Sequence, residues 1–275
     1  MGIARFGADV AASDKDGPMP RALVNGIDLA WERDGEGERL LFLHGSGSTM
    51  AQNSFLRRPF EDAFDVLTLD HRATGASQVP DGPFTMADCA ADVLGLADLA
   101  GWDRFRLVGV SFGGMVAQEV AVTAPHRIDR LALLCTSAGG AGGSSYPLHE
   151  GPPPPHVVDT RFTPEWLAEH RRDRVLVDLA AKRMEGKGYD VIRGEALQLE
   201  ARRHHDAFDR LPAIACPTLV ACGAYDGMAP VANGEAIASQ VPDAEVRTYE
   251  GGHLFAVQDP AAVPDIIGWL AGSSV

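Results

Sequence analysis

The sequence predicts an α/β protein with a mostly parallel central sheet, helices on both faces and an inserted helical lid. Short apolar runs alternate with segments of helical periodicity through most of the 275 residues, which is typical of this fold class. The alternation stops after Ser137 and resumes at Pro217, with helical patterns alone between them. At one junction, the apolar run over 107–110 passes into Gly-x-Ser-x-Gly and a new helical pattern.

The first part of the predicted sheet precedes this serine. Residues 22–32 contain two strand-like runs joined by Asn25-Gly26, a pair that favours the tight turn of a β-hairpin. Thr85 and Asp88 have the spacing of a capping box and predict the start of a helix. The elements expected here are strands at 22–32, 39–43 and 65–70, and helices at 55–64 and 85–99.

The rest of the chain contains the serine junction, the helical segment after Ser137, and the strands and helices that resume at Pro217. Around the junction we expect strands at 104–110 and 128–136, with a helix that begins near Met115 and ends near Pro125. Beyond the interruption we expect strands at 217–223 and 244–249 and helices at 230–240 and 259–270. The predicted organisation is a poorly ordered N-terminus at 1–20, a core at 21–137 and 212–275, and a lid at 138–211 with helices starting near Thr163 and covering 171–184 and 189–204.

Composition restricts the classes of function. The chain is 45% hydrophobic and 23% charged, as expected for a globular protein with one large core. Its net charge of −14 argues against nucleic acid or an anionic membrane as a partner. No apolar run approaches the roughly 20 residues of a membrane helix, and no secretory signal pattern is present, so we expect a cytoplasmic protein. The four cysteines lack C-x-x-C spacing and are expected to be buried thiols, without disulfides or a metal.

Ser111 occupies the apex of the predicted strand–turn–helix junction. A residue at such an apex has strained backbone geometry, and the flanking Gly109 and Gly113 avoid the clashes that side chains would cause. The start of the following helix offers free backbone N–H groups and the positive end of a dipole. This arrangement indicates an exposed nucleophile, although Gly-x-Ser-x-Gly can also occur in an ordinary turn.

A serine nucleophile needs a base, and the base needs an acid that orients it. Among nine histidines, His253 follows the last strand in a glycine-containing loop, so it is placed to reach the carboxyl edge of the sheet. Asp226 follows the strand that resumes after the lid, although Asp226-Gly227 also resembles a simple turn. Asp70 also ends a strand but precedes the serine in the chain.

The reaction also needs donors for an oxyanion. One is expected to be the backbone N–H of Phe112, directly after the serine. The second is expected from the loop after the strand at 39–43, where His44-Gly45-Ser46-Gly47 has the flexibility to direct the Ser46 N–H inward. The alternative for this loop is a plain turn at the end of a strand.

These motifs together resemble the α/β-hydrolase fold superfamily over about residues 21–272. The segment 70–77 is similar to that family's D-x-R-G-x-G-x-S loop, with Ala73 where glycine is usual, so this turn must avoid a positive φ or tolerate strain. Within the superfamily, the sequence is most similar to the enol-lactonase and small-ester-hydrolase group. The resemblance implies a catalytic triad of Ser111, Asp226 and His253 and oxyanion donors at Ser46 and Phe112.

The expected function is that of a serine hydrolase that cleaves a small carboxylic ester or lactone through an acyl-enzyme on Ser111, with no cofactor and no metal. An acyltransferase, a cofactor-free perhydrolase or a C–C bond hydrolase on the same triad are alternatives, and a non-catalytic ligand-binding protein of this fold is a further one. A monomer and a homodimer both remain open. The lid arginines Arg171, Arg172, Arg202 and Arg203 are candidates to bind a substrate carboxylate; the alternative is that they only form a solvated helix face.

Overall fold

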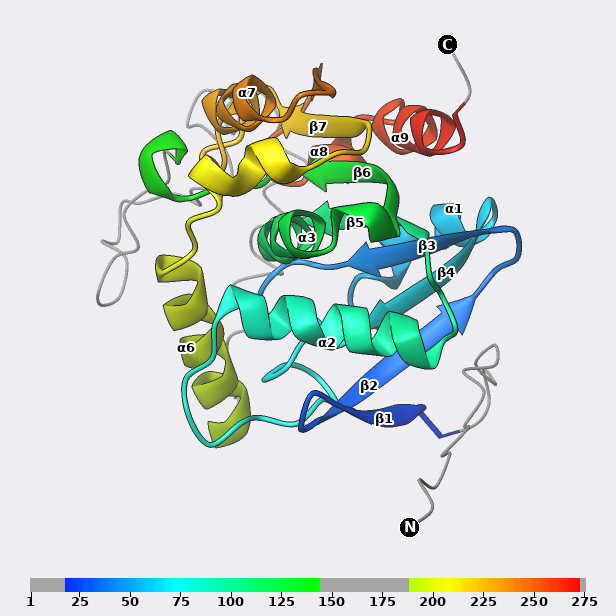
Figure 1. Ribbon diagram of the computed structural model, residues 1–275, viewed down its shortest axis with the longest axis vertical. Helices are drawn as coiled ribbons and strands as arrows, with labels where there is room; N and C mark the ends of the chain where they lie inside the picture. The colour runs from blue at the N-terminus through cyan, green and yellow to red at the C-terminus, as the bar shows by residue number, and fades with distance from the viewer. Residues whose placement is uncertain (1–17, 144–187, 273–275) are drawn as a thin grey trace.

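The structure is a computed structural model that describes residues 18–143 and 188–272 (Figure 1). Most of the expected poorly ordered N-terminus lies outside these ranges. The expected lid helices at 163–165 and 171–184 also lie outside them, with Arg171 and Arg172.

An eight-stranded sheet forms the centre of the molecule, in the order β1-β2-β4-β3-β5-β6-β7-β8. Strands β1–β2 and β2–β4 pair antiparallel, and all the other neighbours pair parallel, so the predicted mostly parallel sheet is confirmed. The strands are β1 (Arg21–Val24), β2 (Ile27–Asp34), β3 (Glu38–Leu43), β4 (Phe64–Leu69), β5 (Phe105–Val110), β6 (Ile128–Leu134), β7 (Thr218–Gly223) and β8 (Ala244–Tyr249).

Helices cover both faces of this sheet (Figure 1). Helices α2, α3 and α7 pack on one face and α1, α8 and α9 on the other. The helices are α1 (Ser54–Glu61), α2 (Met86–Leu99), α3 (Phe112–Thr123), α6 (Tyr189–Arg203), α7 (Val231–Gln240), α8 (Phe255–Gln258) and α9 (Ala262–Leu270). Helix α8, a single turn just after His253, is too short to produce a helical period and was not expected from the sequence.

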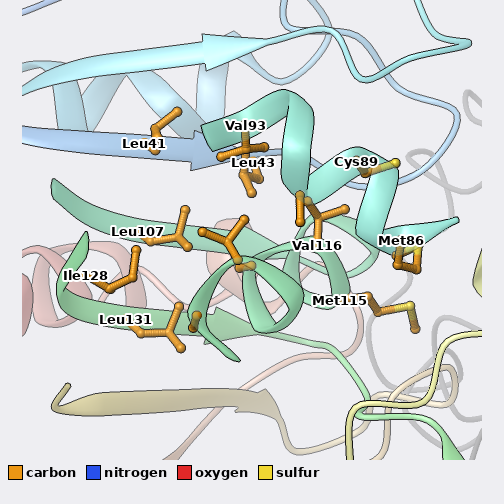
Figure 2. Close-up of a cluster of buried hydrophobic side chains, with 14 of the residues drawn as sticks. Leu41, Leu43, Met86, Cys89, Val93, Leu107, Met115, Val116, Ile128 and Leu131 are labelled. Atoms are coloured by element: carbon orange, nitrogen blue, oxygen red, sulfur yellow. The ribbon is translucent and has the colours of Figure 1, made fainter. Parts of the chain in front are cut away.

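The two hydrophobic cores follow from the alternation of side chains along the strands. In β3, Leu41 and Leu43 belong to the cluster beneath α2 and α3, which Figure 2 shows. Leu40 and Phe42 belong to the cluster on the opposite face. All four side chains are fully buried, as expected for a strand covered by helices on both sides.

Local signals read from the sequence are present in the fold. Asn25 and Gly26 both have positive φ angles, 48° and 75°, as a two-residue hairpin turn of this type requires. The capping box of Thr85 and Asp88 opens α2 with both of its hydrogen bonds. None of the described helices combines the length and apolar character needed to cross a membrane.

The parallel strands end on one edge of the sheet, and their following loops gather there. His44 follows β3, Ser111 follows β5, Asp226 lies three residues after β7, and His253 lies four residues after β8. Helix α6 contacts two loops of this edge, because Gln198 bonds to Gly47 and to the backbone of residue 72. The topology therefore brings residues from distant parts of the chain into one region.

Candidate active site

Ser111 forms the sharp turn between β5 and α3. Its φ and ψ angles of 54° and −113° lie in a region that side chains rarely adopt. A Cβ on Gly109 would lie 2.4 Å from the Gly113 carbonyl oxygen, and a Cβ on Gly113 would lie 2.2 Å from the Leu43 carbonyl oxygen. Both glycines are thus required by the close approach of α3 to the sheet, and Ser111 is pushed to the apex of the turn.

The three side chains predicted from the sequence lie in one hydrogen-bonded row. The distance between Ser111 Oγ and His253 Nε2 is 3.0 Å, and that between His253 Nδ1 and the nearer Asp226 carboxylate oxygen, Oδ2, is 2.8 Å. His253 Nδ1–H donates to the carboxylate, so its Nε2 is left to accept from the serine hydroxyl. The row has the geometry in which a histidine can take a proton from a serine.

The carboxylate of Asp226 is fixed from two sides. Its Oδ1 accepts hydrogen bonds from the backbone N–H groups of Met228 and Ala229, at 2.8 and 2.9 Å. Its Oδ2 faces His253, and the residue is only 4% exposed. The turn suggested by Asp226-Gly227 and the contact with the histidine therefore coexist, because each uses a different carboxylate oxygen.

Cys135 lies beside this row at the end of β6. Its sulfur and ligand atoms of Asp226 and His253 lie within 4.8 Å of one another. Burial, and then the negative charge of Asp226, raise the pKa of the Cys135 thiol well above its ordinary value. A protonated thiol beside a carboxylate that already accepts three hydrogen bonds is a poor metal site. The sequence placed Cys135 in the core but gave no sign of this contact.

The loop after β3 passes next to Ser111. A Cβ on Gly45 would lie 3.6 Å from Ser111 Cβ, so the backbone around Ser46 is close to the serine. Phe112 is the first residue of α3, where backbone N–H groups have no acceptor within the helix. Phe112 therefore adjoins Ser111 in the chain, and Gly45, the residue before Ser46, lies next to Ser111 in space.

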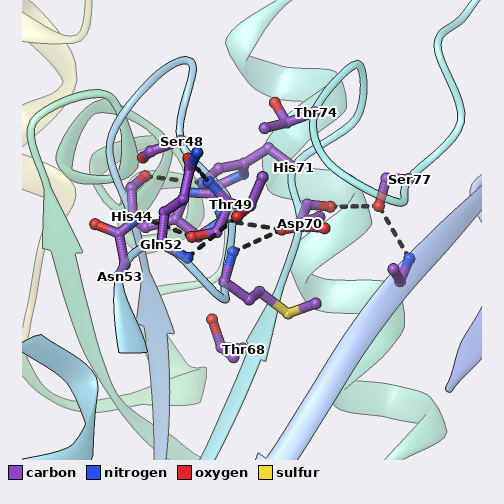
Figure 3. A network of polar contacts seen from close by, with 12 residues as sticks. His44, Ser48, Thr49, Gln52, Asn53, Thr68, Asp70, His71, Thr74 and Ser77 are labelled. Atoms are coloured by element: carbon purple, nitrogen blue, oxygen red, sulfur yellow. Dashed lines mark hydrogen bonds and ion pairs between the residues drawn. The ribbon is translucent and has the colours of Figure 1, made fainter. Parts of the chain in front are cut away.

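Asp70 joins this loop to the segment 71–77 (Figure 3). Its Oδ1 accepts from the Met50 N–H at 2.7 Å and its Oδ2 from the Ala76 N–H at 2.8 Å. Its backbone carbonyl accepts from the Ser77 hydroxyl at 2.6 Å. The side chain is buried, and each carboxylate oxygen accepts from a loop backbone N–H, which indicates a role in loop structure rather than that of the triad acid.

Ala73 adopts a φ of 68°, so the segment tolerates the positive φ that glycine usually provides. Helix α6 covers this turn closely: a Cβ on Gly194 would lie 2.1 Å from the Ala73 carbonyl oxygen. The departure of this sequence from the D-x-R-G-x-G-x-S pattern is therefore accommodated by backbone strain at Ala73.

Two buried histidines support the same loop. His71 Nε2–H donates to the His44 carbonyl at 3.1 Å, and the two imidazole rings pack edge-on (Figure 3). The His71 ring also packs edge-on against Phe112. Burial lowers the pKa of His71 from 6.5 to about 3 and also lowers that of His44. Both imidazoles are therefore neutral near pH 7 and act as hydrogen-bonding groups.

The two described lid arginines differ in their surroundings. Arg203 is exposed and lies 3.6 Å from the Glu200 carboxylate. Arg202 is partly buried, and burial lowers the pKa of its guanidinium. No carboxylate pairs with Arg202 within residues 18–143 and 188–272.

Comparison with known proteins identifies related chains. The profile of the alpha/beta hydrolase fold family matches residues 38–189. The chain is 29% identical over 241 residues to a poly(3-hydroxyalkanoate) depolymerase of Ectopseudomonas oleovorans, covering 83% of this chain and 82% of that protein. It is 26% identical over 248 residues to 3-oxoadipate enol-lactonase 2 of Acinetobacter baylyi, covering 86% and 90%.

Solved structures give the same result. The crystal structure of the enol-lactonase from Burkholderia xenovorans LB400 aligns with a TM-score of 0.74 at 25% identity, covering 92% of this chain and all of that one. The predicted α/β-hydrolase fold and the resemblance to enol-lactonases are confirmed.

The low pKa of His71 predicts a loss of stability in acid. The unfolded chain binds this proton with a pKa near 6.5, whereas the folded protein does so only near 3. Stability is therefore full above about pH 6.5 and falls as the pH drops toward 3, at about 1.4 kcal/mol per pH unit. This group alone should cost about 2 kcal/mol between pH 8 and pH 5 in urea unfolding.

The variant His71→Gln keeps an N–H donor for the His44 carbonyl but removes the titration. It should therefore show a flatter pH dependence of stability than the wild type. His126→Gln, at an exposed position, provides the control and should follow the wild type. Equal slopes for His71→Gln and the wild type would contradict this prediction.

The backbone angles of Ser111 predict stored strain. Ser111→Gly removes the Cβ that makes a φ of 54° unfavourable, whereas Ser111→Ala keeps it. The glycine variant should be more stable than the alanine variant by about 1 to 2 kcal/mol in chemical unfolding. Comparing the two separates strain from the loss of the hydroxyl, and equal stability would show that the turn is not strained.

Proposed function

The chain belongs to the alpha/beta hydrolase fold family, and from this premise we propose that it is a serine hydrolase acting on a small carboxylic ester or lactone. The observation that carries the proposal is the hydrogen-bonded row of Ser111, His253 and Asp226. Hydrolase relatives, among them an enol-lactonase, support a hydrolytic reaction of this chemical class.

In the proposed reaction, His253 Nε2 takes the proton of Ser111 as its Oγ attacks the substrate carbonyl. The oxygen of the tetrahedral intermediate gains a negative charge, which the N–H groups of Ser46 and Phe112 stabilise. His253 then donates the proton to the leaving alcohol oxygen, which gives the acyl-enzyme on Ser111. Asp226 orients the imidazole and stabilises its protonated form throughout.

Water completes the cycle. His253 accepts a proton from water, the resulting oxygen attacks the acyl carbon, and the carboxylic acid leaves as Ser111 regains its proton. These steps move protons and an acyl group between Ser111, His253 and water, so we propose no cofactor and no metal. We also propose that segment 138–211 is a lid, supported by the contacts of α6 with the loop at Gly47.

Two enzyme alternatives use the same site. If another nucleophile enters in place of water, the acyl-enzyme serves an acyltransferase or a perhydrolase, and added alcohol or peroxide would then divert product from the free acid. A C–C bond hydrolase would be identified by its substrate.

A non-catalytic binding protein of this fold is disfavoured by the complete row of hydrogen bonds. We propose a cytoplasmic location, which the four free and buried cysteines support. The net charge of −14 supports the proposal that neither nucleic acid nor an anionic membrane is a partner.

Treatment with a fluorophosphonate probe, followed by peptide mass spectrometry, tests the nucleophile. The wild type should carry one covalent adduct on Ser111, and Ser111→Ala should carry none. The same variant should hydrolyse p-nitrophenyl acetate at least about 10⁴-fold more slowly in kcat. A wild-type protein without the adduct, or an Ser111→Ala variant with wild-type turnover, would overturn the proposal.

From the surroundings of Arg202 we predict that the protein prefers anionic substrates. Its guanidinium is partly buried without a carboxylate partner in the described chain, and it lies one turn after Gln198, which bonds to the loop at Gly47. Arg202→Ala should lower kcat/KM for esters that carry a carboxylate by about 10-fold or more relative to neutral esters. The neighbouring Arg203→Ala is the control and should leave this ratio unchanged. An unchanged ratio in Arg202→Ala would remove Arg202 from substrate binding.

A further inference from the structure

Gln198 is a buried amide in the middle of α6, and it bonds outside its own helix. Its Oε1 accepts from the Gly47 N–H at 2.9 Å. Its Nε2 donates to the Arg72 carbonyl at 3.3 Å and to the Thr74 hydroxyl. Only one orientation of the amide fits, because a backbone N–H can only donate and a backbone carbonyl can only accept.

The burial of this amide makes its contacts specific. Gln198 is 1% exposed, and a buried amide without partners costs free energy that apolar packing does not return. Both of its polar atoms are bound, and the partners come from two loops more than 120 residues away in the chain. A leucine at this position would fill similar space but would leave the Gly47 N–H without this acceptor.

The contact with Gly47 acts on the peptide that follows Ser46. The peptide that precedes Ser46 is held separately, because the Gly45 carbonyl accepts from the Ser48 hydroxyl at 2.8 Å and from His44 Nδ1–H at 3.1 Å. In a trans peptide the N–H points opposite to the C=O, so fixing the Gly45 carbonyl also fixes the direction of the Ser46 N–H. With both flanking peptides held, the backbone at Ser46 has little freedom to rotate.

The distance between α6 and the loops depends on a glycine. Gly194 lies one turn before Gln198, where a Cβ would come within 2.1 Å of the Ala73 carbonyl oxygen. This close approach places the helix backbone near enough for one glutamine side chain to span both loops. Gly194 and Gln198 therefore form one contact surface of α6, directed at the carboxyl edge of the sheet.

We propose that Gln198 is a positioning residue of the oxyanion hole, through which the packing of α6 sets the direction of the Ser46 N–H. The inference rests on the function proposed above, since it assumes that the Ser46 N–H stabilises an oxyanion on a Ser111 adduct. Helix α6 is then part of the catalytic structure as well as of the substrate enclosure. Substrate binding that moves α6 would alter catalysis through this single amide.

The expected kinetic signature is a fall in kcat with an unchanged KM. An oxyanion donor interacts with the transition state far more strongly than with the ground-state carbonyl. Complete loss of such a donor costs about 10²- to 10³-fold in kcat, so a misdirected donor should cost between about 10- and 100-fold. A trifluoromethyl ketone, which forms a tetrahedral adduct with the serine, should lose affinity by the same factor.

The test compares Gln198→Leu with the wild type, using p-nitrophenyl acetate turnover and inhibition by a trifluoromethyl ketone. We expect kcat and inhibitor affinity to fall together by between about 10- and 100-fold, with KM within about twofold of the wild type. The fluorophosphonate adduct on wild-type Ser111 is measured in parallel. If the wild type has the adduct but Gln198→Leu keeps kcat and inhibitor affinity, this inference fails while the proposed function stands. If the wild type lacks the adduct, the proposed function itself is wrong.

A matched control separates positioning from a weakened helix. Ala196 lies two residues before Gln198, at an exposed position of α6. Ala196→Gly weakens the helix through the low helix propensity of glycine, without removing a contact of Gln198. It should leave kcat and inhibitor affinity unchanged, and an equal loss in this variant would assign the effect to fraying of α6.

A double-mutant cycle tests whether the two supports act on the same group. Ser48→Ala removes the hydroxyl that binds the Gly45 carbonyl and should lower kcat in the same manner as Gln198→Leu. Because both changes act through the Ser46 N–H, the double variant should lose less than the product of the two single effects. Strictly multiplicative effects would show that Gln198 and Ser48 act on different parts of the reaction.

Discussion

The close approach of α3 to the carboxyl edge of the sheet is the constraint on which the site depends. It requires Gly109 and Gly113, because any side chain there would overlap backbone oxygens or other backbone atoms. The same contact forces Ser111 into an unfavourable backbone conformation at the apex of the turn. It also packs the ring of Phe112 against that of His71, with the ring centroids 5.3 Å apart. This contact connects the start of α3 to the neighbouring loop. The packing of α3 on the sheet thus offsets the backbone strain at Ser111 and fixes the position of this serine.

Directional polar contacts, rather than apolar packing, determine how the surrounding loops lie. Asp70 binds one backbone N–H group of the loop after β3 and one of its own loop, and Gln198 joins those two loops to α6. Arg72 forms a buried ion pair with Asp92 of α2, which anchors the same segment to the helical layer. Buried polar groups are costly when one partner is lost, so such a network permits very few arrangements of the loops. This explains why flexible glycine-containing segments can present well-defined atoms to a substrate.

Several features could be predicted from the sequence because they depend on local pattern. The period of apolar residues predicts the strands and the long helices, and the Asn25-Gly26 turn follows from its two residues. Others could not be predicted. Helix α8 is a single turn and gives no period, and the positive φ of Ala73 contradicts the preference of its side chain. Ala73 adopts it because the contacts of its loop outweigh the local cost.

By itself, the sequence determined the order of strands and helices and which chemical groups end each strand: a serine after β5, an aspartate after β7 and a histidine after β8. These features depend on residues that are neighbours in the sequence. Only the tertiary structure decided that the histidine lies 3.0 Å from the serine and 2.8 Å from the aspartate. It also decided that Cys135 lies beside the histidine and the aspartate, and that Gln198 reaches a loop 151 residues away. Contacts of this kind depend on how the helices and strands pack in three dimensions, and spacing along the chain carries no record of them.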